Sequence, residues 1–180
     1  MKTALYSHAR HWPLALFVMA MPWLITPAAA AQADPDDVAS IESIIHAVYD
    51  VISGDAGVAR DWQRWYSLFA AEASLSAVID SDGGFQRVTM TPASYAANSG
   101  PILERDGFHE TEIHHISERF GQIAHVFSTY ESRRSADDSE PFARGINSFQ
   151  LMNDGSRWWV VSIYWQAESE DNPVPARYGG

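Results

Sequence analysis

The sequence predicts an α+β domain, with helices packed on one face of a curved antiparallel sheet. Three observations lead to this fold class. The chain has 180 residues, about the length of one domain. Hydrophobic residues make up 46% of it, which is enough for a packed core. Helical periodicity dominates the first half of the chain, and four long segments with strand character occupy the second half.

Residues 1–31 are predicted to be a signal peptide. A basic start with Lys2 and Arg10 precedes an apolar run over residues 14–25 and a stretch of small residues. The run is too short to cross a bilayer, which takes ~20 residues, although a retained membrane anchor is the alternative. We therefore expect a periplasmic or secreted protein with no stable membrane anchoring after cleavage. Cleavage is expected after Ala30, Ala31 or Ala33.

Two helices are predicted at the start of the mature chain. Residues 32–37 form a polar lead-in, and one of its aspartates can cap the first helix. Isoleucine and valine then recur three and four residues apart, which predicts a helix over 37–53 that ends at Gly54. Aromatic residues at the same spacing predict a second, shorter helix over 58–69.

A strand pair and a third helix are predicted next. Small and apolar residues alternate over 73–79, a turn cluster follows at 80–84, and residues 85–90 form the return strand. A threonine cap and a proline at the first helical position predict a helix over 91–103. The pair Gly100-Pro101 is expected to interrupt or kink this helix.

The second half of the chain is strand-like throughout. A turn cluster at 153–156 predicts a hairpin between the last two strands. The domain is expected to cover residues 38–168, and residues 169–180, which are polar and contain two prolines, are expected to be a disordered tail. The four predicted strands cover residues 108–120, 122–133, 142–152 and 157–167.

Charge and composition exclude several classes of function. The formal net charge is −11, which argues against a nucleic-acid binder because such a protein needs a basic face. The chain has no cysteine and therefore no disulfide or thiolate metal site. It also lacks nucleotide-binding glycine motifs and strong metal-ligand spacing. We expect no metal, no other cofactor and no nucleic-acid partner.

Two segments resemble the nuclear transport factor 2-like superfamily, in its SnoaL-like and ketosteroid-isomerase-like branch. Residues 65–73, WYSLFAAEA, resemble the stretch from the second helix of that family into its first strand, and residues 153–161, NDGSRWWVV, resemble its last hairpin. The resemblance covers residues 38–168. It implies a cone-shaped α+β barrel, in which three helices pack on the concave face of the strongly curved sheet and leave a mostly apolar pocket.

The resemblance also implies positions for catalytic groups. The aspartate base of ketosteroid isomerases corresponds to Ala77, and their pocket tyrosine on the first helix falls near Ala47, two residues from Tyr49. Their oxyanion-binding acid corresponds to Asn147, whose amide can still donate a hydrogen bond. The family's known base is therefore missing here.

Candidate acid–base groups gather on the strand over 108–120. Alternate residues of a strand share a face. If the hairpin loop to the next strand is Phe120-Gly121, then His114 faces Phe127 and Glu110 faces Glu131. This register places four candidates on one face: Glu112, His114, His125 and Glu131.

Such a face supports acid–base chemistry. Two opposed carboxylates raise the pKa of one of them, and a histidine beside a glutamate exchanges protons near neutral pH. In this interpretation Glu112 or Glu131 is the base, His114 or His125 assists, and Asn147 holds an enolate oxygen. The alternatives are a solvated acidic face and a hydrogen-bonded core histidine at His125.

Aromatic residues are the candidate ligand-binding groups and a candidate interface. Trp158 and Trp159 place an aromatic ring on both faces of the last strand. Helices cover one face, so we expect a homodimer through the other face of the sheet. The candidate ligand-binding residues are Tyr49, Trp62, Trp65, Tyr66, Trp158 and Tyr164.

Three hypotheses for function follow. The first is an exported SnoaL-like protein that binds a small hydrophobic molecule in the pocket of the cone. The alternative is a cofactor-independent isomerase, cyclase or lyase with a Glu/His acid–base pair. The third is a structural or assembly protein that uses only its sheet surface.

Overall fold

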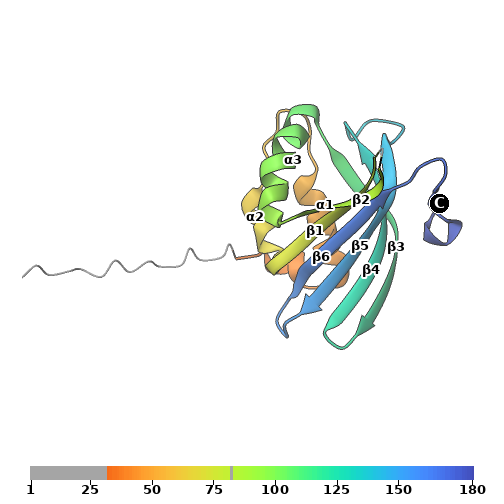
Figure 1. Ribbon diagram of the computed structural model, residues 1–180. Coiled ribbons are helices and arrows are strands. Elements are labelled where there is room, and N and C mark those ends of the chain that lie inside the picture. Colours follow the sequence, from red (N-terminus) through yellow and green to blue (C-terminus); the bar gives the residue numbers. More distant parts are fainter. Residues whose placement is uncertain (1–31, 82) are drawn as a thin grey trace, which may run out of the picture.

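A six-stranded sheet with three helices against one face forms the domain (Figure 1). The structure is a computed structural model, and it describes residues 32–81 and 83–180. The predicted signal peptide lies outside the described residues. Within them, the predicted fold class of three helices packed on a curved sheet is confirmed.

The sheet is open and mixed. Its strands follow the order β2-β1-β6-β5-β4-β3, so β2 and β3 are its edges. All neighbouring strands pair antiparallel except β1 and β6, which run parallel. The sequence predicts an antiparallel sheet that forms a barrel, whereas the observed sheet is mixed and is not closed. The strands are β1 Phe69–Ser81, β2 Gly84–Met90, β3 His109–Phe120, β4 Ile123–Arg133, β5 Ala143–Asn153 and β6 Trp158–Ala167.

The first two helices are shorter than predicted because capping side chains begin them later. A 3₁₀ turn, η1 (Pro35–Val38), precedes helix α1 (Ile41–Ile52), and Ser40 caps α1 by accepting from the backbone N–H of Ser43. Helix α2 covers only Trp62–Ser67, since Asp61 caps its first turn. In both helices the side-chain cap satisfies N–H groups that have no partner within the helix.

Helix α3 (Pro92–Asp106) continues through the expected break. Thr91 caps it and Pro92 takes the first helical position, as predicted, but Pro101 lies inside the helix without ending it. Pro101 is exposed, where water can bond the carbonyl that loses its partner. Gly100 is buried against α2, and a Cβ atom there would lie 2.7 Å from the ring of Trp62. A glycine therefore allows the two helices to approach closely.

A β-bulge changes the predicted β3–β4 register. The tight loop is Gly121-Gln122, and the register shifts between Glu112 and His114. Because this loop lies one residue further along the chain than the predicted Phe120-Gly121, His114 pairs with Thr129 and not with Phe127, and the predicted register is wrong. The extra residue sends the side chains that follow it to the opposite face from the predicted one.

The hydrophobic core lies between the helices and the concave face of the sheet. It contains the inward face of α1 and the inward residues of β4, β5 and β6. The largest of its fully buried side chains belong to Trp65, Phe149, Ile44, Ile45 and Leu68.

Residues 169–180, here named the C-terminal strap, lie along the convex face of the sheet, opposite the helices (Figure 1). The strap ends in a short 3₁₀ turn, Ala176–Tyr178. The ring of Tyr178 packs 5.2 Å from the ring of Phe127 on β4, and Thr129 Oγ1 donates to the Tyr178 carbonyl at 2.7 Å. These contacts place the strap, which the sequence predicts to be a disordered tail, against the apolar convex face.

Candidate functional site

A cavity of about 270 Å³ lies between the helices and the concave face of the sheet. Residues of all three helices form one wall, and residues of β1, β3, β4, β5 and β6 form the other. The lining is mainly apolar, with Glu110 and Asn147 as polar groups in the sheet wall. Its aromatic lining residues are Trp65, Tyr95, Phe108, Tyr130, Phe149 and Trp165.

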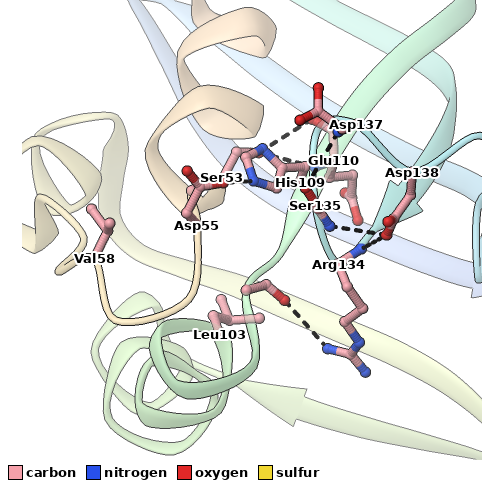
Figure 2. Close-up of polar contacts among 12 residues, drawn as sticks. Ser53, Asp55, Val58, Leu103, His109, Glu110, Arg134, Ser135, Asp137 and Asp138 are labelled. Carbon is pink, nitrogen blue, oxygen red and sulfur yellow. Dashed lines mark hydrogen bonds and ion pairs between the residues drawn. The ribbon is translucent and has the colours of Figure 1, made fainter.

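Glu110 is the carboxyl group in the wall of this cavity. Ser132 Oγ donates to its Oε2 at 2.9 Å, and Asn147 Nδ2 donates to its Oε1 at 3.4 Å. Ser53, directly after α1, accepts from the backbone N–H of Glu110 at 2.9 Å and so ties β3 to the helix (Figure 2). Burial raises the pKa of Glu110 to about 7, against the lowering effect of both donors.

A directed chain of hydrogen bonds holds Asn147. Its amide donates to Tyr49 Oη at 3.0 Å, so the tyrosine proton is donated onward to Ser128 Oγ at 2.7 Å. Ser128 in turn donates to Glu112 Oε2. The chain fixes the amide so that its N–H groups, and not its oxygen, face Tyr49 and Glu110.

Two tyrosines add hydroxyl groups to the cavity. Tyr95 comes from α3 and Tyr130 from β4. Burial and the nearby carboxylate of Glu110 raise the pKa of both phenols above their usual range. Both hydroxyls therefore remain protonated at neutral pH and can donate to a bound molecule.

Two of the five predicted catalytic residues lie on the concave side. Asn147 lines the cavity. Glu112 instead faces a polar recess between α1 and β3, where His115 Nδ1 lies 2.7 Å from its Oε1. Glu110 lines both spaces, so the two carboxyls have different surroundings although they stand two residues apart.

The other three lie on the convex side. His125 Nε2 is 3.1 Å from Ser148 Oγ, which matches the hydrogen-bonded alternative for this histidine. Glu131 pairs with Arg133 at 2.8 Å and with Arg144 at 3.4 Å. His114 lies under Gly179 of the strap. The predicted face of four acid–base groups is therefore not formed, since the bulge in β3 separates Glu112 from His114.

The predicted ligand-binding aromatics also separate. Trp65 lines the cavity. The ring of Trp62 packs edge-on against the ring of Trp65, with 6.2 Å between the ring centroids. Tyr49 belongs to the hydrogen-bond chain described above. The remaining three lie elsewhere: Trp158 is buried beneath Arg119, and Tyr66 and Tyr164 are exposed, the latter on the convex face.

Sequence reasoning missed most of the cavity wall. It placed Glu110 opposite Glu131 as one of two carboxylates but did not name Glu110 as the base. It also did not single out Tyr95, Tyr130 or Trp165 as pocket residues. Their inward orientation depends on how α3 and the curved sheet meet, and no local pattern encodes that.

The described residues contain no group of three or more histidine, aspartate or glutamate side chains arranged to hold a metal ion. In the same part of the chain, no helix has the length and apolar character needed to cross a membrane.

Comparisons with known proteins identify the fold. No family profile and no curated protein sequence matches the chain. Solved structures do match. A protein described as the beta subunit of an aromatic-ring-hydroxylating dioxygenase from Novosphingobium aromaticivorans is 11% identical, with a TM-score of 0.55, and the alignment covers 73% of this chain and 88% of that one.

Two further structures are similar. A Nostoc punctiforme protein of unknown function with a cystatin-like fold is 10% identical, with a TM-score of 0.54 over 72% of this chain and 90% of that one. LinA is 10% identical, with a TM-score of 0.53 over 73% of this chain and 85% of that one. The chain thus has the fold of nuclear transport factor 2-like proteins, as its resemblance implied. At such low identity the likeness describes the fold alone.

Proposed function

We propose that the protein binds a small, largely apolar molecule in the concave cavity. The observation that carries this proposal is that the cavity has an aromatic lining and only a few polar groups. These polar groups come from α3 and from the sheet. Binding sites for small molecules have this composition, and a volume of about 270 Å³, just below their usual range of about 300–1,000 Å³, limits the ligand to a small molecule.

The polar groups favour a neutral ligand with one hydrogen-bond acceptor. Glu110 is ionised above about pH 7 and disfavours a second negative charge in the cavity. The hydroxyls of Tyr95 and Tyr130 can donate to a carbonyl oxygen, and protonated Glu110 can do the same below that pH. We therefore place small hydrophobic carbonyl compounds first among the candidate ligands.

A thermal-shift screen of such compounds tests the proposal. Ser99 on α3 lines the cavity, and its neighbour Asn98 is exposed. Ser99→Trp fills the cavity and is expected to abolish the shift, whereas Asn98→Trp leaves it unchanged. A compound whose shift survives Ser99→Trp binds elsewhere and contradicts the assignment.

A second candidate function is cofactor-independent acid–base catalysis of an isomerase, cyclase or lyase type. The observation that favours it is the pKa of Glu110, about 7, at the cavity wall. In this role the Glu110 carboxylate removes a proton from the carbon next to the ligand carbonyl. Hydroxyl donors hold the resulting enolate oxygen, and the proton returns to a carbon of the product.

Proton exchange distinguishes binding from catalysis. In D₂O, a ligand found in the screen is expected to incorporate deuterium next to its carbonyl, as followed by NMR. Glu110→Gln keeps the shape of the side chain and is expected to remove the exchange while binding persists. Unchanged exchange in Glu110→Gln rejects Glu110 as the base. If the unaltered protein shows no exchange, catalysis of this kind is rejected and only the binding function remains.

The proposed function includes export, on the basis of the signal-peptide pattern in residues 1–31. N-terminal sequencing of the exported protein is expected to begin between Ala31 and Asp34. A start at Met1 on the exported protein would contradict it.

The proposed function also includes a homodimer through the convex face of the sheet. Exposed apolar residues on that face support it, with Tyr164 46% and Ile116 41% exposed. One similar structure is described as a subunit of a larger protein, which is compatible with assembly.

A further inference from the structure

We propose that the C-terminal strap and a second copy of the chain compete for the convex face of the sheet. The inference rests on the proposed homodimer and adds its control: the dimer forms only when the strap leaves.

The strap is attached to the sheet through Tyr178 and Gly179. Tyr178 contacts Phe127 through its ring and Thr129 through its carbonyl. Gly179 lies directly on His114, and Arg144 Nη2 donates to its carbonyl at 3.4 Å. Because these contacts lie on β3, β4 and β5, the strap covers the half of the face next to the β3 edge.

Between this attachment and its start the strap is loosely packed. A cavity of about 420 Å³ separates it from the sheet. Val78, Phe127, Ile146 and Tyr164 line the sheet side, and Pro173 and Val174 line the strap side. The apolar side chains that line this cavity lack packing partners, so this part of the strap is held weakly against the sheet. An occupant that fills the space can therefore displace the strap.

Further apolar surface continues beyond the strap. A row of side chains in register crosses the ends of four strands: Phe120 opposite Ile123, Ile123 opposite Met152, and Met152 opposite Trp159. Of these, Phe120 is 83% and Ile123 61% exposed. Glu118, His125 and Gln150 separate this row from Ile116 and Phe127, so the row forms a second apolar patch at the loop end of the same face. Two such patches on one face suit a sheet-on-sheet contact.

Ion pairs offset charge repulsion at this face. Glu131 pairs with Arg133 and Arg144, and Arg144 also lies 3.5 Å from Glu168. Two copies of an acidic chain can therefore meet here without placing unpaired carboxylates of this cluster against each other.

Competition follows from the spacing of packed sheets. Two sheets that pack face to face lie about 10 Å apart, with only their side chains between them. The strap places a backbone and its own side chains in that layer over β3, β4 and β5. A second sheet and the strap thus cannot cover these strands together.

Light scattering on purified protein tests the inference. Residues 32 onward contain every described helix and strand, and removal of residues 169–180 leaves all six strands and α1 to α3 intact. The chain from residue 32 to 180 is expected to be a monomer at micromolar concentration. The chain from 32 to 168 is expected to associate at least ~10-fold more tightly, with a doubled mass.

Point variants release the strap without truncation. Thr129→Val removes the hydroxyl that bonds Tyr178, and Tyr178→Ala removes the ring contact with Phe127; both are expected to shift the intact chain toward dimer. Tyr66→Ala removes an exposed ring from α2, on the helix side of the sheet, and is the matched control that is expected to change nothing. Tyr164→Glu places a charge in the contact and is expected to keep the shortened chain monomeric.

Different results overturn the proposed dimer and the proposed competition. If the shortened chain and both strap-releasing variants stay monomeric at ~100 µM, both the inference and the proposed dimer are overturned. If the intact chain dimerises as tightly as the shortened one, and Tyr164→Glu breaks that dimer, the dimer stands and the competition is overturned.

Discussion

At the scale of single residues, the carboxyl group of Glu110 combines burial with ionisation near neutral pH. Ser132 and Asn147 donate to it, and burial outweighs both donors, so its pKa rises from 4.5 to about 7. A group of this kind is favourable in the fold when protonated and unfavourable when ionised.

Glu110 makes the stability of the protein depend on pH. Its pKa is higher in the folded than in the unfolded state, so the folded state holds the extra proton and stability falls as the pH rises from 4.5 through 7. The difference is on the order of 3 kcal/mol. Urea unfolding across this range is expected to show Glu110→Gln gaining stability relative to the unaltered protein as the pH rises.

Only the difference between the two proteins isolates Glu110, because other acids titrate in the same range. A difference that is constant from pH 4.5 to 8 would contradict the assigned pKa. Glu118→Gln, at an exposed position of the same strand, is the matched control and is expected to show no such trend.

Tyr49 is the second residue whose polar group can be tested. Its hydroxyl accepts from Asn147 and donates to Ser128, and all three residues are buried. Tyr49→Phe leaves both partners without that bond and is expected to lower the free energy of unfolding by about 1–3 kcal/mol. Tyr66→Phe changes an exposed ring and is expected to cost nothing measurable in the same urea experiment. Equal effects of both changes would contradict a buried network.

At the scale of elements, β5 approaches its neighbours closely at Gly145. A Cβ atom there would lie 2.6 Å from the hydroxyl of Tyr130 and against the backbone of β6. Gly145→Ala is therefore expected to lower stability by about 1–3 kcal/mol, since backbone cannot move aside easily. Thermal unfolding of the purified variant measures the loss.

Gly83→Ala is the matched control for this change. A Cβ atom at Gly83 would meet only a side-chain nitrogen of Gln86 at 3.6 Å, an ordinary contact. Its unfolding temperature is expected to match that of the unaltered protein. A neutral Gly145→Ala variant would show that β5 and β6 can separate locally.

The bulge in β3 is the element-scale feature with most consequence for the site. It leaves Glu110 and Glu112 on the concave side and sends His114 to the convex side. A strand without it would have placed Glu112 and His114 on one face, as the sequence alone suggests. One inserted residue thus determines which titratable groups can share a ligand.

At the scale of the whole molecule, the excess of acids dominates the electrostatics. The chain has 23 acidic and 12 basic residues, and the like charges repel in the compact state. Raising NaCl from ~0.01 to ~0.15 M shortens the Debye length from about 30 to 8 Å and is expected to increase stability by about 0.5–1 kcal/mol. Urea unfolding at neutral pH measures it. A decrease would show that ion pairs, such as Arg64 with Asp37 and Asp50, outweigh the repulsion.

Local patterns in the sequence were sufficient for the element order. Capping residues and periodicity located α1, α3 and the strands of the second half, because these signals act within a few residues of the chain. The boundaries of α2 and the continuation of α3 through Pro101 were not predictable. They depend on which side chain caps a helix and on whether a broken backbone bond faces water.

The candidate site was predicted only in part. Asn147 and Trp65 were expected in the cavity and line it. Tyr95 and Tyr130 were missed, and Glu110 was considered only as the carboxylate opposite Glu131. The three residues belong to different elements and meet only where α3 and the sheet curve together.

The sequence by itself determined the α+β class, the acidic charge and the supply of aromatic and carboxylate groups, since these follow from composition and short-range pattern. Tertiary structure decided which carboxylate is buried, which face each strand residue takes, and what covers the convex face. Those outcomes depend on register, on the bulge and on contacts between residues far apart in the chain. Thr129 and Tyr178, 49 residues apart, meet only once the sheet has formed.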